Sequence, residues 1–195
     1  MMIYLLDSPL DDTSHSRYII DIIKEHSTVT IQLIPINLPI TIGQLCQTIY
    51  DLLPIVLPRD IVLCPWAVSA NEQIDDLFTE LSSLCYVVVA AGNFHAPIED
   101  YSPARVSDVI TIGTLNKSGL IAALSNYSNT KEVVWIPGTN YNVGWKNSSG
   151  TSVSAALYAA FLSVAIEQDN MDLLHSLIEK QKTIVFGELS INFKA

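Results

Sequence analysis

The sequence predicts an α/β protein of three layers (α/β/α), in which helices cover both faces of a mostly parallel central sheet. Two patterns carry this prediction. Segments with the period of strands alternate along the chain with segments that have the period of helices. Residues 87–91 form an unbroken apolar run rich in valine, which is typical of a strand buried on both faces of a sheet. The length of 195 residues, 49% of them apolar, suits one domain over residues 1–195 with a sizeable core.

The elements of the amino-terminal part follow from their local patterns. Residues 2–6 form the first predicted strand, which ends at Asp7. Thr13 and Ser14 are residue types that cap helices, and four isoleucines between positions 19 and 23 give the next helix a buried stripe. The other predicted elements here are a strand of alternating apolar and polar residues at 29–34, a helix with one apolar face at 41–53, and a short apolar strand at 60–64.

Residues 71–84 have the clearest helical pattern in the chain. Asn71 can cap this helix, and the apolar residues that start at Ile74 are spaced i, i+3, i+4 and i+7. The remaining predicted elements are strands at 87–91, 109–115 and 133–136, an alanine-rich helix at 153–166, and a last helix at 171–181 that is followed by residues 183–186.

Composition excludes several classes of protein. The net charge is −10 and no cluster of Lys or Arg is present to neutralise phosphates, so we expect no nucleic-acid partner. Residues 27–50 carry no charge, but prolines, a glycine and glutamines interrupt them, so we expect no membrane span. The amino terminus lacks a basic segment, and we expect neither a signal peptide nor a propeptide.

The cysteines and acidic residues do not indicate a cofactor. The three cysteines, Cys46, Cys64 and Cys85, lie in apolar surroundings and are expected to be free thiols in the reducing cytoplasm. No loop is dense in residues that bind metals, so we expect no cofactor.

Polar side chains with catalytic chemistry occur where predicted strands end and helices begin. Asp7 and Asn93 follow strands, while His15 and Ser152 begin helices. In a parallel sheet the carboxyl ends of the strands meet at one edge, where functional groups gather. A serine nucleophile needs an imidazole to take its proton, a carboxylate to orient that imidazole, and N–H donors for the oxyanion. The pattern therefore predicts Ser152 as nucleophile, His15 as base and Asp7 as its partner, with Asn93 and the Ser152 N–H as oxyanion donors.

Each of these residues also has a structural alternative. Ser152 could simply cap its helix, and Asn93 could be a turn residue. Asp7 could cap a turn, and His15 could be an exposed residue at a helix start. The alternative histidines are His26, His95 and His175, of which His95 lies closest to Asn93 in the sequence and could belong to a substrate loop.

Several motifs resemble those of the subtilases, the subtilisin-like serine proteases, in which the order Asp, His, Ser is known. Leu5-Leu6-Asp7-Ser8 is similar to the aspartate motif of that family, with Pro9 in place of glycine. Only eight positions separate Asp7 from His15, a distance that the chain can span although the family has a longer insert there. The stronger matches, in chain order, are 87–93 (VVVAAGN), 101–104 (YSPA) followed by 108–113 (DVITIG), 122–127 (AALSNY), 137–138 (PG) and 149–152 (SGTS).

The resemblance implies a minimal subtilisin-like fold and a serine endopeptidase activity with the four residues in the roles given above. It also implies substrate contacts at Pro65, Trp66, Ala67 and Gly92. Pro65 has no N–H for a ladder bond with a substrate, and Trp66 could fill a side-chain pocket, so we expect narrow substrate choice.

Three functions therefore remain open, of which a serine hydrolase that acts on esters has no Gly-x-Ser-x-Gly motif in its support. The first is a peptidase that acts on a peptide or protein substrate, either unaided or with an activating protein partner. The second is an inactive pseudoprotease that serves as a binding or scaffolding module, since the residues around His15 depart from the histidine motif of the family.

Overall fold

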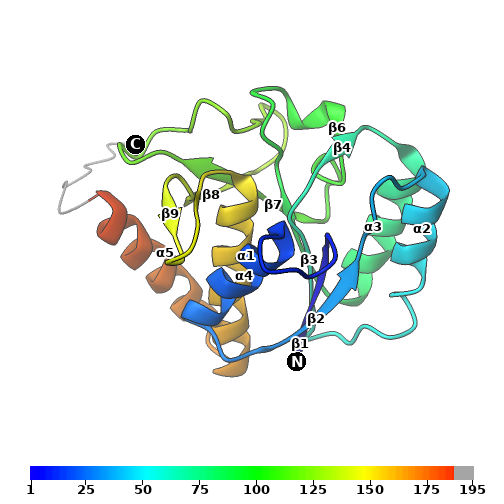
Figure 1. Cartoon of the computed structure of the whole chain (residues 1–195), viewed down its shortest axis with the longest axis horizontal. Coiled ribbons are helices and arrows are strands. Elements are labelled where there is room, and N and C mark those ends of the chain that lie inside the picture. Colours follow the sequence, from blue (N-terminus) through cyan, green and yellow to red (C-terminus); the bar gives the residue numbers. More distant parts are fainter. Residues whose placement is uncertain (187–195) are drawn as a thin grey trace.

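The computed structural model describes residues 1–186 and has a six-stranded sheet at its centre (Figure 1). The strand order is β2-β1-β3-β5-β7-β8, and every neighbouring pair is parallel. The strands are β1 (Met2–Asp7), β2 (Thr30–Pro35), β3 (Ile61–Cys64), β5 (Tyr86–Ala90), β7 (Ile110–Leu115) and β8 (Val134–Pro137).

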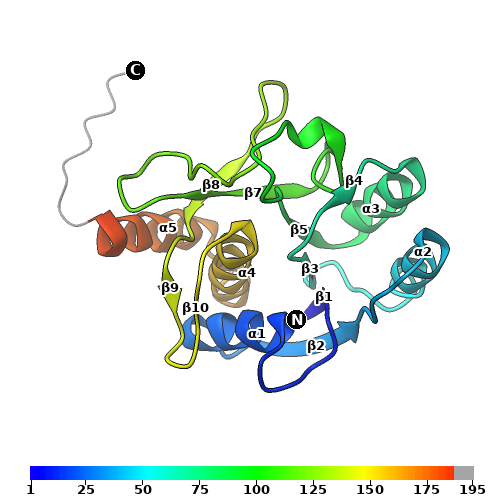
Figure 2. The ribbon, with the colours of Figure 1, turned by 45° about the horizontal axis from the view of Figure 1, so that its top comes forward.

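Helices cover both faces of this sheet, as the sequence predicts. On one face lie α1 (His15–His26), α4 (Thr151–Glu167) and α5 (Met171–Phe186), and on the other lie α2 (Ile42–Tyr50) and α3 (Glu72–Leu84) (Figures 1 and 2). The predicted three-layer α/β/α architecture is therefore confirmed. No helix in the described part of the chain is both long and apolar enough to cross a bilayer.

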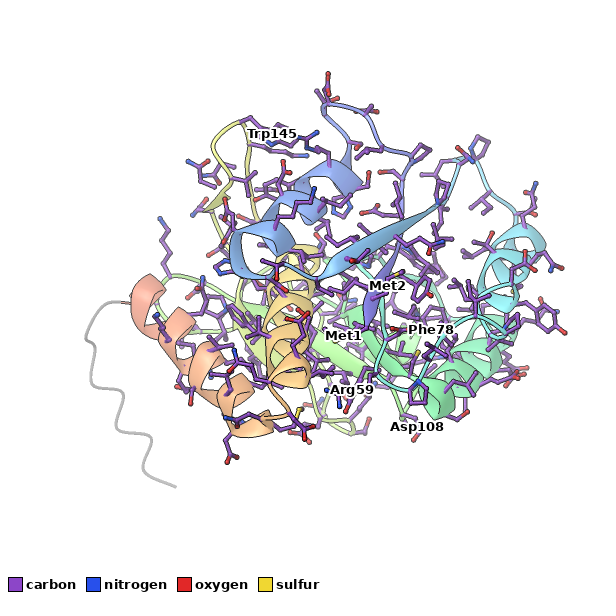
Figure 3. All side chains as sticks on the ribbon, turned by 90° about the horizontal axis from the view of Figure 1, so that it is seen from below. Met1, Met2, Arg59, Phe78, Asp108 and Trp145 are labelled. Atoms are coloured by element: carbon purple, nitrogen blue, oxygen red, sulfur yellow. The ribbon has the colours of Figure 1, made fainter. Side chains whose placement is uncertain are left out.

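The alternation of side chains along β1 divides the core in two. Ile3 and Leu5 pack with the α1, α4 and α5 layer, whereas Tyr4 and Leu6 pack with the α2 and α3 layer. Phe78 of α3 lies in this second core, between its helix and the sheet (Figure 3). Because β1 is buried on both faces, Asp7 at its end is held by two packed layers.

Capping residues set the starts of the helices. Ser14 accepts a hydrogen bond from the Arg17 N–H at the start of α1, and Asn71 accepts one from Ile74 at the start of α3. Thr41 and Gln44 form a capping box at the start of α2. The α5 helix continues to Phe186, beyond the predicted end at 181.

The sequence patterns do not predict two short antiparallel ribbons. β4 (Val68–Ser69) pairs with β6 (Tyr101–Ser102), and β9 (Tyr141–Asn142) pairs with β10 (Asn147–Ser148). Two residues are too few to show an alternating pattern, so these strands depend on tertiary contacts. Trp145, in the loop that joins β9 to β10, donates a hydrogen bond to Asp21 of α1 over 2.9 Å (Figure 3).

Candidate active site

Asp7 and His15 form a close pair at the end of β1. The Nδ1 atom of His15 lies 2.7 Å from Oδ2 of Asp7. The carboxyl group is held on its other side as well, because the Ser8 N–H donates to Oδ1 over 2.7 Å. Asp7 is 6% exposed, whereas the side chain of His15 is 40% exposed. The imidazole therefore has one nitrogen bonded to a buried carboxylate and its other nitrogen available for a further partner.

Residues 8–14 connect Asp7 to His15, and this short link is long enough to bring the two side chains together. The Ser16 N–H donates to Ser8 Oγ over 3.3 Å, and Ser16 Oγ donates to Pro9 O over 3.4 Å. Ser14 Oγ donates to Asp11 O over 3.0 Å while it also caps α1. These bonds fold the link back on itself, so that α1 begins beside the end of β1.

Ser152 lies in the first turn of α4. The residue that caps this helix is Gly150, so the alternative in which Ser152 serves as the cap is wrong. Ser152 is 9% exposed, and among residues 1–186 neither its hydroxyl nor its backbone N–H makes a hydrogen bond. An unpaired N–H in the first turn of a 17-residue helix is a ready donor to an anion.

Asn93 is fixed by the residue before Ser152. Its Oδ1 accepts hydrogen bonds from the Thr151 N–H over 2.9 Å and from Thr151 Oγ1 over 3.1 Å. A backbone N–H can only donate, so the oxygen of the carboxamide faces Thr151 and Nδ2 is the free donor. Thr151 Oγ1 in turn accepts from the Gly92 N–H over 3.1 Å. The Asn93 carboxamide is thereby oriented by the helix that carries Ser152.

The structure thus brings the predicted site residues together in two pairs. One is Asp7 with His15, and the other is Asn93 with the start of α4. These pairs lie on elements that pack on each other, since α1 packs against α4 (Figure 2). No hydrogen bond joins His15 to Ser152 within residues 1–186.

The other three histidines lie elsewhere. His26 ends α1, with Nε2 at 2.6 Å from Tyr141 Oη. His95 packs against the ring of Tyr127, and His175 is exposed on α5. Of the four histidines, His15 is the one that is bonded to Asp7.

An apolar cleft of about 310 Å³ lies beside His15. The Trp66 ring forms one wall and is held in place, because its Nε1 donates to Leu6 O over 2.9 Å and its ring makes a T-shaped contact with Phe78. The sequence analysis names Trp66 as a substrate contact but does not name the other apolar residues that line the cleft. The sequence pattern that could have identified them is the alternation of apolar residues after β2. The lining residues are Asp7, Ser8, His15, Ile36, Leu38, Ile40, Leu45, Trp66 and Val68.

The remaining predicted substrate residues lie at the ends of β3 and β5. Pro65 is buried, whereas Ala67 is partly exposed. Ala67 and Gly92 are close neighbours, because a Cβ atom on Gly92 would lie 3.3 Å from the Cβ of Ala67. Gly92 has a φ of +103°, a conformation that favours glycine.

The three cysteines, all in the described part of the chain, are free thiols. Burial raises the pKa of Cys64, and the nearby charge of Asp7 adds to this effect. Burial also raises the pKa of Cys85 to about 12. A thiol with a raised pKa is a poor nucleophile, which leaves Ser152 as the nucleophilic candidate. Over the residues that the structure describes, no group of three or more His, Cys, Asp and Glu side chains could hold a metal ion.

Comparisons with known proteins identify the family of the chain. The profile described as "Subtilase family" matches residues 65–181, more than half of the chain. "Alkaline serine exoprotease A" of Vibrio alginolyticus is 32% identical over 97 residues, which are 47% of this chain and 18% of that protein. "Subtilisin-like protease 2" of Pseudogymnoascus destructans is 38% identical over 87 residues, which are 45% of this chain and 21% of that protein. The matched stretch therefore spans about a fifth of these relatives.

Solved structures share the fold over most of the chain. A "cold adapted subtilisin-like serine proteinase" matches with a TM-score of 0.72 and 16% identity, over 91% of this chain and 79% of that one. The "self-cleaved protease domain of PatA" matches with a TM-score of 0.69 and 17% identity, over 91% of this chain and 85% of that one. These matches confirm the predicted subtilisin-like fold. Together with the family profile, they show that the chain belongs to the subtilase family.

Proposed function

We propose that this chain is a serine peptidase of the subtilisin type, which cleaves peptide bonds in a narrow set of peptide or protein substrates. The observation that carries the proposal is the bond of 2.7 Å between His15 Nδ1 and the buried carboxylate of Asp7. A neutral imidazole held in this way keeps Nε2 unprotonated and ready to accept the proton of a serine. The names of the relatives, a serine exoprotease and a subtilisin-like protease, support the same activity.

The reaction begins when Ser152 Oγ attacks the scissile carbonyl carbon while His15 Nε2 takes the hydroxyl proton. Asp7 stabilises the resulting imidazolium, and Asn93 Nδ2 and the Ser152 N–H donate to the oxyanion. The intermediate collapses, the C–N bond breaks, and His15 gives its proton to the leaving amine. Water then attacks the acyl-serine by the same route, which releases the acid and returns the proton to Ser152. In unliganded enzymes the bond between nucleophile and base is commonly long and tightens when substrate binds.

The apolar cleft beside His15 supports a preference for substrates with apolar side chains. It adjoins the base of the proposed reaction, so a substrate side chain that fills it also holds the scissile bond near His15. Pro65 has no N–H to offer to a substrate strand, which reduces the backbone contacts available and makes the side chains more decisive.

A second candidate function is the pseudoprotease, a binding or scaffolding module without turnover. The observation in its favour is that His15 and Ser152 share no hydrogen bond in the described part of the chain. A partner that moved the His15 side chain toward the start of α4 would supply that bond, and it would then be the activating protein partner that the sequence analysis left open.

Labelling with a fluorophosphonate probe, read by peptide mass spectrometry, separates these functions. The peptidase proposal predicts labelling at Ser152 that is lost in Ser152→Ala and His15→Ala. Ser118→Ala and His175→Ala are matched controls, since both residues are exposed and away from the site. A folded protein that stays unlabelled favours the pseudoprotease, and labelling that appears only with an added protein identifies an activating partner.

The three unpaired cysteines also lead us to propose a reducing compartment such as the cytoplasm. Fractionation of cells that express the tagged chain tests this location, and recovery outside the cell would contradict it.

A further inference from the structure

Asn126 is a fully buried polar residue whose side-chain hydrogen bonds all go to one short segment. It precedes β8 and is 0% exposed. A buried carboxamide is costly unless its donors and acceptors are all used, so the identity of its partners shows what it stabilises. These partners are backbone groups of residues 91–96, the segment that contains Asn93.

Its hydrogen bonds flank Asn93 on both sides. Before Asn93, Nδ2 of Asn126 donates to Ala91 O over 2.9 Å, and the Asn126 N–H donates to Gly92 O over 2.9 Å. After Asn93, Oδ1 of Asn126 accepts from the Phe94 N–H over 2.9 Å and from the Ala96 N–H over 3.2 Å. The orientation of the carboxamide is unambiguous, because backbone N–H groups can only donate and carbonyl oxygens can only accept.

The segment needs such support because its backbone is unusual. Gly92 has a φ of +103° and His95 a φ of +52°. Non-glycine residues adopt positive φ infrequently, and surrounding contacts must hold them there. There is also no room for a side chain at Gly92, since a Cβ atom there would lie 2.5 Å from Nδ2 of Asn126.

Asn126 also lies in an Asn-Tyr-Ser sequence, the pattern of an N-glycosylation acceptor. An acceptor must be accessible at the surface, and the complete burial of Asn126 excludes that use. The pattern is coincidental, and the role of Asn126 is internal.

We infer, on the basis of the proposed function, that Asn126 is a positioning residue for the oxyanion site. It fixes the backbone on both sides of Asn93, while Thr151 fixes the Asn93 side chain. Both sets of contacts are needed. If the backbone at Asn93 moves, its carboxamide no longer reaches the oxyanion even when Thr151 still orients it. A displacement of about 1 Å in an active site costs on the order of 10²-fold in rate.

The test is a double-mutant cycle on the full chain, with the rate of Ser152 labelling by a fluorophosphonate probe as the readout. Asn126→Ser removes the carboxamide, and Asn93→Ala removes the oxyanion donor. We expect Asn126→Ser to slow labelling by at least about tenfold when Asn93 is present, and by less than about threefold when Asn93 is already alanine. A purely structural role would slow labelling equally in both backgrounds, and that result would overturn the inference, as would an unchanged rate in the Asn126→Ser single variant.

Ser125→Ala provides a milder variant if Asn126→Ser fails to fold. Ser125 Oγ donates to the Asn126 carbonyl over 3.0 Å and accepts from the Thr114 N–H, so its loss loosens Asn126 and leaves the carboxamide in place. We expect a smaller decrease in rate that again disappears in the Asn93→Ala background, and a decrease that persists there contradicts the inference. Labelling of the unmodified chain tests the proposed function separately: no labelling there rejects the peptidase, whereas additive effects in the cycle reject only the role of Asn126.

Discussion

The Nδ1 atom of His15 lies 2.7 Å from Oδ2 of Asp7, although only eight positions separate the two residues in the chain. The carboxylate ends a strand that is buried on both faces, and the imidazole begins a helix that packs on the same sheet. The pair therefore depends on two well-packed elements and not on a long insert. In the proposed peptidase, this relationship determines which imidazole nitrogen faces the substrate.

Asp7→Asn is the sharpest test of that relationship. The amide preserves the shape of the side chain but stabilises the wrong tautomer of His15, so the rate of peptide cleavage should fall by about 10⁴. The measurement is kcat on individual peptides from a casein digest that the wild type cleaves, with thermal unfolding to verify the fold. Asp76→Asn, an exposed substitution on α3, is the matched control and should leave kcat unchanged. A decrease of less than about tenfold would show that Asp7 does not orient the base.

Asn93→Ala should lower kcat by about 10²–10³ with little change in KM, because Nδ2 donates to charge that develops only in the transition state. The exposed Asn129→Ala serves as control. Steady-state kinetics on the same peptides decide the point. If kcat changes by less than about tenfold, the oxyanion assignment is wrong.

Leu38→Asp probes the apolar cleft. Leu38 is 78% exposed and lines the cleft, so the change should leave the fold intact while it places a charge where an apolar substrate side chain binds. We expect KM to rise and kcat to remain similar, since ground-state and transition-state binding are lost together. Leu57→Asp, at a position that is 64% exposed and outside the cleft, should change neither constant. Equal effects of the two variants would mean that the cleft does not bind substrate.

His26 makes the stability of the fold depend on pH. Burial lowers its pKa below the ordinary value of 6.5, and the charge of Glu25 opposes this shift. Its neighbours are Tyr141, whose Oη lies 2.6 Å from Nε2 of His26, and Phe161, whose ring makes a T-shaped contact with the imidazole. As the pH falls below 6.5, the unfolded chain takes up a proton at this position before the folded chain does. The contribution of His26 to the free energy of unfolding is thus complete above that pH and decreases below it.

Urea unfolding of the wild type and of His26→Gln, from about pH 5 to pH 8, measures this effect. The variant should lose less stability on acidification than the wild type does. His175→Gln controls for the removal of an exposed histidine. Identical pH profiles for the wild type and His26→Gln would mean that other residues cause the loss of stability at low pH.

Much of the architecture could be predicted because it depends on patterns within single elements. Some features can be recognised from a few neighbouring residues alone. Examples are the stripe of isoleucines in α1, the caps Ser14 and Asn71, and the apolar run of β5. The family motifs likewise predict Asn93 and Ser152 at the ends of elements. By contrast, β4, β6, β9 and β10 have two residues each, too few for a pattern to form.

The sequence by itself determined the layers and the parallel sheet, and it predicted the four residues proposed for catalysis. Tertiary structure decided what surrounds them. The bonds of Asn126 to residues 91–96 and the apolar cleft beside His15 both join segments that lie about 20 positions apart or more. The physical reason is that periodicity and capping act over a single turn or strand, whereas contacts between distant segments form only when the sheet and helices are packed together.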